Sequence, residues 1–270
     1  MDILFKDGKP KTLTLSYDDG KIFDEQLVEI LDRYGLKCTF NLNSGLYSDE
    51  NSISRSKTMS RTQAQRLFIN SPHEVAIHGF KHQHMEILNR TELIHEIIED
   101  KKQAETNFQR IIRGMAYPFG TYNEDVLSAL RLCGIKYSRT VNATNSFMLP
   151  QNWLELNPTC HHRSPRLMEL AEEFVNGTNY RYKMFYLWGH SYEFNNDNNW
   201  SVIENFADFI GGRDDIWYAT NIEIYDYVNA YNSLNTSYDG KYIQNPSAIP
   251  VWVRCSERTY KINPGETVEV

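Results

Sequence analysis

The sequence lacks both a long apolar run and a cluster of basic residues. No window of the 270-residue chain reaches the roughly 20 apolar residues that a membrane-spanning helix needs. The net charge is −7, without any basic run, which argues against a nucleic acid or an anionic membrane as a partner. Residues 1–10 are polar and charged, so we expect a cytoplasmic protein, although a secreted chain trimmed of its signal peptide would look the same.

Cysteine is scarce, and no two cysteines form a C-x-x-C pair. Zinc ribbons and thioredoxin-like redox motifs need such pairs, so neither is present. The four cysteines are far apart and lie among apolar or aromatic neighbours or at the ends of predicted elements. We therefore expect buried free thiols in a reducing compartment, at Cys38, Cys133, Cys160 and Cys255. A charged fraction of 23% and a hydrophobic fraction of 41% indicate one sizeable core without long disorder.

What the sequence does contain is a repeated alternation of short apolar runs with helical patterns. Strands are predicted over 12–17, 37–42, 74–78, 114–117, 135–140, 183–189 and 217–220. Helices are predicted over 23–34, 62–69, 91–112, 123–132, 166–176, 201–210 and 222–234. Repeated strand–helix units imply an α/β fold with parallel strands and right-handed crossovers. About seven strands favour a closed barrel over an open sheet, although spacing alone does not decide between them.

The pattern changes after residue 235. Turn signals at Asp239-Gly240, Asn245-Pro246 and Asn263-Pro264-Gly265 separate short β-like runs. We therefore predict two parts, a (β/α) barrel over residues 1–235 and a small β-rich extension over 236–270. The extension is expected to have three or so strands and to pack on the barrel.

Two adjacent aspartates stand at the end of the first predicted strand. Asp18 and Asp19 precede Gly20, and barrel enzymes carry their chemistry at the C-terminal ends of strands. Neighbouring carboxylates repel each other unless a cation is present, so one could bind a metal ion while the other acts as a base. The competing interpretation is a plain turn, which this segment alone favours.

A pair of histidines follows the strand predicted over 74–78. Two rings four residues apart, at His78 and His82, would share one face of a helical turn and could bind a first-row metal ion. Two imidazoles and one carboxylate leave positions open for water and substrate, as a catalytic zinc site requires. Three other histidines nearby are expected to face solvent: His73, His84 and His95.

Two further strand ends carry candidate residues. His190 ends the strand predicted over 183–189 and could be a general acid near neutral pH or a structural residue. The segment Tyr117-Pro118-Phe119-Gly120 would form a tight turn whose backbone N–H groups could face a developing oxyanion. Without other context, a simple strand-to-helix turn is the favoured interpretation of that segment.

These segments, in this order, resemble the polysaccharide deacetylases of carbohydrate esterase family 4, the NodB-homology domain. The family's T-F-D-D-G motif is similar to Ser16-Tyr17-Asp18-Asp19-Gly20, and its H-[ST]-x-x-H motif to His78-Gly79-Phe80-Lys81-His82. Its R-x-P-[FY] motif is similar to Ala116-Tyr117-Pro118-Phe119, and its L-x-H motif to Trp188-Gly189-His190. The resemblance covers roughly residues 10–225 and implies a distorted (β/α) barrel with fewer than eight units.

The resemblance also implies an activity, the metal-dependent removal of N-acetyl groups from an acetamido sugar or polysaccharide. It assigns a divalent metal, usually zinc, to Asp19, His78 and His82. Asp18 would be the base that takes a proton from metal-bound water, and His190 the acid that protonates the leaving amine.

The same resemblance assigns the third motif to the substrate. Tyr117, Pro118 and Phe119 would form the turn that binds the oxyanion, with the backbone N–H of Phe119 acting beside the metal. The N-acetylated carbohydrate is the partner that these assignments imply.

The sequence departs from the family pattern at two supporting residues. The arginine of the third motif, which pairs with the base in the family, is replaced by Ala116, and the D-x-x-D-W motif has no match between residues 135 and 153. We predict that Arg139 lies within salt-bridge distance of Asp18, with a surface ion pair as the alternative. Glu193, three residues after His190, could orient that ring or face solvent.

A further polar segment lies in a proline-bounded loop. His161, His162 and Arg163 could line the mouth of the site, but we expect a solvated loop. Neither interpretation assigns these residues a chemical role.

Three functions remain in competition on sequence grounds. The leading one is hydrolysis of an acetamido group on a sugar. The second is the same metal site acting on another small amide or a cyclic ureide, with the aromatic segment 188–200 shaping a closed pocket. The third is a catalytically weakened sugar-binding relative, which the missing arginine would mark.

Overall fold

The computed structural model describes residues 1–49, 57–177 and 182–270. A curled sheet of eight parallel strands forms its centre, in the order β6-β5-β4-β3-β2-β8-β7, with β9 also paired to β2. The strands are β2 (Lys11–Asp18), β3 (Cys38–Leu42), β4 (Glu74–Ile77), β5 (Gly114–Ala116), β6 (Tyr137–Arg139), β7 (Cys160–His161), β8 (Lys183–Gly189) and β9 (Ile216–Tyr218). The seven predicted strands are present, and β7 was not predicted.

The sheet curls into a barrel, but no regular ladder of hydrogen bonds joins its two edge strands among the described residues. Among the described residues, the edge strands β6 and β7 do not pair with each other. The segment 156–159 lies between β6 and β8 instead, because Leu156 donates its N–H to the carbonyl of Ser138 (3.0 Å) and Thr159 donates to that of Tyr186 (2.8 Å). The predicted distorted (β/α) barrel is thereby confirmed.

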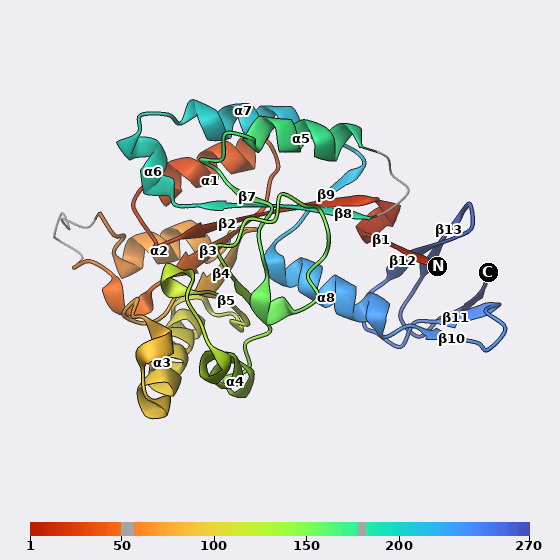
Figure 1. The fold of residues 1–270 in the computed structure, drawn as a ribbon, viewed down its shortest axis with the longest axis horizontal. Coiled ribbons are helices and arrows are strands. Elements are labelled where there is room, and N and C mark those ends of the chain that lie inside the picture. Colours follow the sequence, from red (N-terminus) through yellow and green to blue (C-terminus); the bar gives the residue numbers. More distant parts are fainter. Residues whose placement is uncertain (50–56, 178–181) are drawn as a thin grey trace.

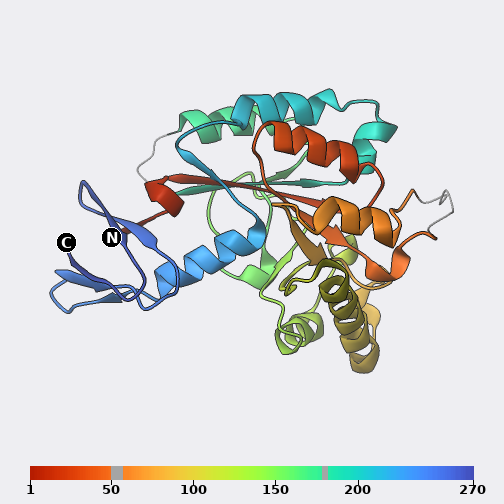
Figure 2. The same ribbon diagram turned by 180° about the vertical axis from the view of Figure 1, so that it is seen from behind.

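Eight α-helices of the described chain lie around this barrel, and Figure 1 shows α1, α5, α6 and α7 together on one side of β2 and β8. On the other side lie α2, α3 and α4, and α8 runs toward the C-terminal strands, as Figure 2 shows from behind. Their bounds are α1 (Asp24–Arg33), α2 (Arg61–Phe68), α3 (Arg90–Phe108), α4 (Glu124–Leu132), α5 (Leu167–Asn176), α6 (Ser191–Asn196), α7 (Ser201–Ile210) and α8 (Asn221–Asn232).

Local signals explain most of these helix ends. Asn123 caps α4 by accepting the N–H of Val126, as expected for a side chain that satisfies a free donor of the first turn. The prediction that α3 continues to Ile112 was wrong, since Gln109 adopts a left-handed conformation (φ 54°) and ends the helix. The six-residue helix α6 was not predicted, because it is too short for a helical period to be recognised.

The interior of the barrel contains a network of buried polar side chains beside a second apolar cluster, whereas the outside of its sheet is apolar. Alternation along β2 sends Leu15 into the core beneath the helices and turns Thr14 and Ser16 inward. Thr14 Oγ1 donates to Asn221 Oδ1 (2.8 Å), and Ser16 Oγ accepts from Asn41 Nδ2 (2.7 Å). Buried polar groups are tolerated where each finds a partner, so this interior is a network of hydrogen bonds that reaches the functional end of the barrel.

The C-terminal residues form two three-stranded antiparallel sheets rather than one group of about three strands. Their strands are β1 (Asp2–Leu4), β10 (Asn235–Thr236), β11 (Tyr242–Gln244), β12 (Val251–Cys255), β13 (Arg258–Ile262) and β14 (Thr267–Glu269). Strand β1 pairs with β12, so the start of the chain belongs to the extension and both termini lie there (Figure 1). We therefore propose to place residues 2–4 with the extension.

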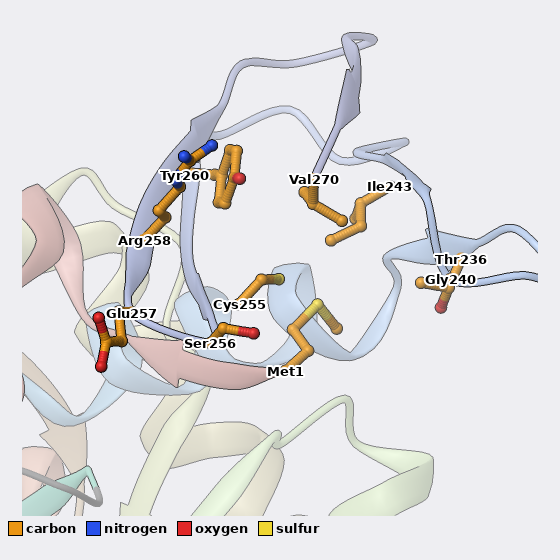
Figure 3. Close-up of a pocket in the computed structure, with 10 residues that line it drawn as sticks. All are labelled: Met1, Thr236, Gly240, Ile243, Cys255, Ser256, Glu257, Arg258, Tyr260 and Val270. Atoms are coloured by element: carbon orange, nitrogen blue, oxygen red, sulfur yellow. The ribbon is translucent and has the colours of Figure 1, made fainter.

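A cavity of about 870 Å³ opens between these two sheets. Met1, Cys255, Ile243 and Val270 point into it, and Arg258 lies at its edge (Figure 3). Cys255 is partly exposed there, contrary to the prediction of four buried thiols, because it ends β12 at the cavity. The other three cysteines are buried, and all four thiols are free.

None of the helices in the described ranges is both long enough and apolar enough to cross a bilayer.

Glu74, the first residue of β4, is a buried carboxyl in the interior network. It accepts hydrogen bonds from the Tyr137 hydroxyl (2.7 Å), from Thr39 Oγ1 (2.9 Å) and from the N–H of Ile222 (3.0 Å). Burial raises the pKa of Glu74 to about 7 and outweighs the three hydrogen bonds, which lower it.

This carboxyl should make stability fall as pH rises. A pKa raised in the folded state means that folded Glu74 binds its proton more tightly than unfolded Glu74, whose pKa is about 4.3. The free energy of unfolding should therefore drop between about pH 4.5 and 7, by on the order of 1–3 kcal/mol for this group. In urea titrations at pH 5 and pH 8, Glu74→Gln should show a smaller drop than the wild type. Glu172→Gln, at an exposed position on α5, is the matched control. An equal drop in wild type and Glu74→Gln would contradict the assignment.

Candidate metal centre and active site

Three predicted ligands converge at the C-terminal ends of β2 and β4. Asp19 Oδ1 lies 3.7 Å from His78 Nε2 and 3.6 Å from His82 Nε2. The ring nitrogen His78 Nδ1 is 2.8 Å from the carbonyl of Ala116, so Nδ1–H donates and Nε2 presents its lone pair to the other two side chains. Ligand atoms around a tetrahedral ion at about 2.0–2.1 Å are separated by roughly 3.4 Å, so the three atoms fit a divalent metal.

We predicted that a helical turn brings the two histidines together, and this prediction was wrong. Residues 78–82 form a turn in which Gly79 (φ 80°) and His82 (φ 51°) both have positive φ values. Asn43 Nδ2 donates to the carbonyls of His78 and Gly79, both at 2.6 Å, and so holds the turn. Buried Asp100 accepts the N–H of His78 (3.1 Å). Asn43 and Asp100 were missed, since a polar residue at a predicted strand end or inside a helix has no distinctive sequence signal.

Asp18 lies beside these ligands, but it is almost completely buried and is held by two other side chains. Asn41 Nδ2 donates to its Oδ1 (2.8 Å), and the Arg139 guanidinium forms an ion pair with its Oδ2. Burial alone would raise the pKa of Asp18, but Arg139, His78 and His190 together lower it to about 2. Asp18 is therefore a carboxylate at any moderate pH.

The predicted proximity of Arg139 to Asp18 is thus observed, and its origin is the sheet register. Ala116 in β5 pairs with Arg139 in β6, so the guanidinium comes from the position next to the residue that replaces the family's arginine. The guanidinium carbon lies 4.2 Å from the centre of the Trp188 ring, which covers it in a cation–π contact. Arg139 is fully buried and is not a surface residue.

His190 also lies near Asp18, and it begins a cluster of histidines around one carboxylate. Its Nε2 lies 3.9 Å from Asp18 Oδ2, and its Nδ1 lies 3.3 Å from Glu193 Oε2. The same Glu193 oxygen is 3.2 Å from His161 Nε2 and 3.2 Å from His162 Nε2. Glu193 Oε1 is paired with Arg163 Nη1 at 2.9 Å.

These contacts set the charges of the cluster. Burial would raise the pKa of Glu193, but the three imidazoles hold it far below its usual range. Burial lowers the pKa of His190, yet the contact with Glu193 and the charge of Asp18 raise it above its usual value. His190 therefore keeps its proton to a higher pH than a free histidine does.

The prediction of a solvated loop at His161 and His162 was wrong. His161 is in β7, and His162 is buried against Tyr17 and Phe194, with ring centroids 5.7 and 4.1 Å away. Burial lowers the pKa of His162 to about 4, so its ring is neutral near pH 7. A Cβ on Gly189 would lie 2.0 Å from His162 Nδ1, so a glycine at this point of β8 allows the close approach.

The third motif forms a turn as predicted, but the Tyr117 side chain faces away from the metal ligands. Its hydroxyl donates to the carbonyl of Leu154 (2.7 Å) in the core. Pro118 is buried, whereas Phe119 has a positive φ (57°) and is 52% exposed. The Phe119 ring stacks on His84 at 3.9 Å and meets His82 edge-on at 4.5 Å. Only the backbone of this turn and the Phe119 ring are thus available to a substrate.

The remaining histidines fall into two groups. His84 and His95 are exposed, as expected. His73 is buried, contrary to expectation, because its Nδ1 accepts the N–H of Cys38 (3.1 Å) and its Nε2 lies 3.3 Å from Asp32 Oδ1. His73 therefore ties β3 to α1 and has a structural place outside the site.

Comparisons with known proteins agree with this arrangement. Residues 5–138 match the sequence model of the family described as polysaccharide deacetylase. No curated protein sequence matches the chain. A solved structure from Mycobacterium smegmatis, assigned to the polysaccharide deacetylases, is 15% identical over 86% of this chain and 95% of that chain, with a TM-score of 0.63.

Two other solved structures are similar in fold. A family 4 acetyl xylan esterase from Clostridium thermocellum, in complex with a cobalt ion, is 14% identical over 79% of this chain and 90% of that one, with a TM-score of 0.52. BA3943 from Bacillus anthracis, described as a CE4 family pseudoenzyme, is 13% identical over 83% of this chain and 68% of that one, with a TM-score of 0.50. By its sequence match and its fold, the chain belongs to the polysaccharide deacetylase family, the CE4 family with the NodB-homology domain.

The geometry predicts which side chains a metal ion needs. His78→Ala removes a candidate ligand and should weaken the binding of a divalent ion, with zinc as the test metal, at least about 100-fold, because loss of a ligand costs more than loss of an outer partner. Asp18→Asn should keep the ion bound, since Asp18 faces Arg139 and Asn41. Metal content after dialysis, measured by mass spectrometry, tests both. Equal zinc loss in both variants would show that Asp18 is itself a ligand.

Proposed function

We propose that the chain is a metal-dependent hydrolase that removes N-acetyl groups from an acetamido sugar or polysaccharide. The observation that carries the proposal is the position of Asp18. Its Oδ2 lies 3.8 Å from His78 Nε2, one of the three candidate ligands, and 3.9 Å from His190 Nε2. The candidate base thus lies within 4 Å both of the candidate acid and of one of the side chains, Asp19, His78 and His82, that would hold a metal ion.

The metal ion would be divalent, and we propose zinc on the two-histidine, one-carboxylate donor set. When bound, it would supply Lewis acid chemistry, polarising the acetyl carbonyl and making a neighbouring water more acidic. The cobalt complex of the Clostridium thermocellum esterase supports a divalent ion in this fold.

The chain's own residues would perform the proton transfers. Asp18, an ionised carboxylate, would accept a proton from the attacking water. His190 would donate its Nε2 proton to the nitrogen as the carbon–nitrogen bond breaks, and its raised pKa keeps that proton available near neutral pH. The backbone N–H of Phe119 would donate to the developing oxyanion. The products are acetate and a free amine.

Two side chains would support this pair. Arg139 would keep Asp18 ionised and fix its direction. Glu193 would hold the His190 ring through Nδ1, so that Nε2 faces the substrate. Arg139 would supply the positive charge of the missing third-motif arginine, and Glu193 would supply the negative charge of the missing D-x-x-D-W motif.

The substrate class rests on family membership and on the rim of the site. Phe119 presents an exposed ring next to His82, held by its stack on His84. Exposed aromatic rings suit the apolar face of a pyranose, so this ring supports a sugar over a purely charged substrate.

A second candidate function is a sugar-binding protein with weakened catalysis. The replacement of the family's arginine by Ala116 and the similarity in fold to a CE4 family pseudoenzyme favour it. The Arg139 ion pair argues against it, because the charge partner of Asp18 is present.

Acetate release separates these functions. The zinc-loaded protein should release acetate from at least one member of a panel of N-acetylglucosamine monomers, oligomers and acetylated polymers. Asp18→Asn and His78→Ala should each lose at least about 1,000-fold in kcat/KM, since they remove the base and a ligand. Activity that survives both changes refutes the mechanism. Zinc binding and oligomer binding without turnover would establish the second candidate, and turnover only of small amides or cyclic ureides would replace the substrate class.

Arg139 provides a separate test. Arg139→Met leaves a buried carboxylate without its charge partner, which should lower the free energy of unfolding by roughly 3 kcal/mol and kcat by at least about 10-fold. Because Asp18→Asn removes the stranded charge, the double variant Asp18→Asn/Arg139→Met should regain part of the stability. Urea denaturation measures this, and additive losses in the double variant would mean that the two side chains do not act as a pair.

A further inference from the structure

A buried side-chain hydrogen bond joins the two helices that follow Asp18 and His190 in the chain, and the proposed mechanism assigns it no role. Helix α1 begins at Asp24, shortly after the two aspartates, and α6 begins at Ser191, directly after His190. Ser191 Oγ donates to Asp24 Oδ1. Both side chains are buried, with relative exposures of 0% and 1%.

This hydrogen bond links α6 to α1 and adds to the contacts that place α6 against the sheet. Strand pairing sets Gly189 beside Tyr17, and Glu193 of the six-residue helix α6 pairs with His161, His162 and Arg163. Within the described ranges, no other side-chain hydrogen bond joins α1 to α6. The Tyr17 and Phe194 rings also meet, with centroids 6.0 Å apart, and connect α6 to β2 by an apolar contact. The hydrogen bond between Ser191 and Asp24 is therefore the direct polar link between the helix that follows Asp19 and the helix that follows His190.

The charge state of Asp24 suits such a role. Burial raises the pKa of Asp24 to about 8; the Ser191 hydrogen bond opposes this, and the charges of Asp19 and Asp18 add to it. Asp24 is thus mostly protonated near pH 7 and adds no further negative charge to the site. Its other oxygen, Oδ2, has no hydrogen-bond partner among the residues that the structure describes.

We propose that Asp24 and Ser191 are positioning residues that set the distance between His190 and Asp18. The inference rests on the proposed function, because it gives His190 a place in the reaction. Neither side chain touches the substrate; both act through the backbone, since Ser191 adjoins His190 in sequence and Asp24 follows the turn that bears Asp18 and Asp19.

Kinetics of matched variants test the proposal. Ser191→Ala in the zinc-loaded protein should lower kcat about 10-fold, as a small misplacement of an acid does, with KM and zinc content within about 2-fold of wild type. Asp24→Ala should have the same effect, and the double variant should be no slower than the slower single variant. Asp24→Asn, neutral and of the same shape, should recover most of the activity lost in Asp24→Ala.

The control is Thr12→Val, at the far end of β2. It also removes one buried hydroxyl hydrogen bond, from Thr12 Oγ1 to the Trp217 carbonyl (2.9 Å). Thr12→Val and Ser191→Ala should lose similar thermal stability, while only Ser191→Ala loses kcat. A Ser191→Ala variant with wild-type kcat overturns the proposal.

Crystal structures supply a readout that does not depend on activity. The separation of His190 Nε2 from Asp18 Oδ2 is 3.9 Å with the hydrogen bond present. We expect a change of at least about 1 Å, or a disordered His190, in Ser191→Ala or, if that variant does not fold, in Asp24→Ala. An unchanged separation overturns the proposal. If the wild type releases no acetate from any substrate, the proposed function fails, and the crystallographic separation alone decides the role of this pair.

Discussion

The buried ion pair between Asp18 and Arg139 is the interaction on which the rest of the site depends. A carboxylate with almost no exposure is stable only if an opposite charge lies against it and its remaining oxygen finds a donor. Arg139 supplies the charge and Asn41 supplies the donor. The Trp188 ring covers the guanidinium, and the polar interior of the barrel continues the network away from Asn41 through Ser16. The pair thereby holds an ionised carboxylate directly beside the three candidate metal ligands, where a proton acceptor would be needed.

Two charged groups of the family's motifs are absent from their usual positions in this chain. Other residues place the same charges beside Asp18 and His190. The positive charge beside Asp18 comes from β6 instead of β5, at the same level of the barrel. The negative charge beside His190 comes from Glu193 in α6 and is held by His161, His162 and Arg163. Both relocations are physically possible because the pKa of a group responds to the distance and sign of its neighbours, whichever strand or helix provides them. The absence of a motif residue is therefore weak ground for inferring the absence of its charge.

The sequence allowed most of the fold to be predicted, because apolar periodicity reports which face of each element is buried. The seven predicted strands and seven predicted helices are present, whereas the two-residue strand β7 and the short helix α6 have too few residues to show a period. The pair His78 and His82 was predicted for the wrong reason, since a turn with positive φ values, not a helix, brings the rings together. His162 and His73 were expected in solvent and are buried, because residue type alone does not reveal which loop will be covered by a later part of the chain.

Sequence by itself determined the strands, the helices that cover them and the strand ends at which Asp18, Asp19, His78, His82 and His190 stand, because local periodicity and turn chemistry depend on near neighbours in the chain. The tertiary structure alone decided which charges meet. Arg139 lies 121 residues from Asp18, and Asp24 lies 167 residues from Ser191. Such contacts follow from strand order and register, which depend on how the whole sheet closes. The partners of the candidate catalytic residues, and with them the charges that those residues carry, are for that reason a property of the folded barrel.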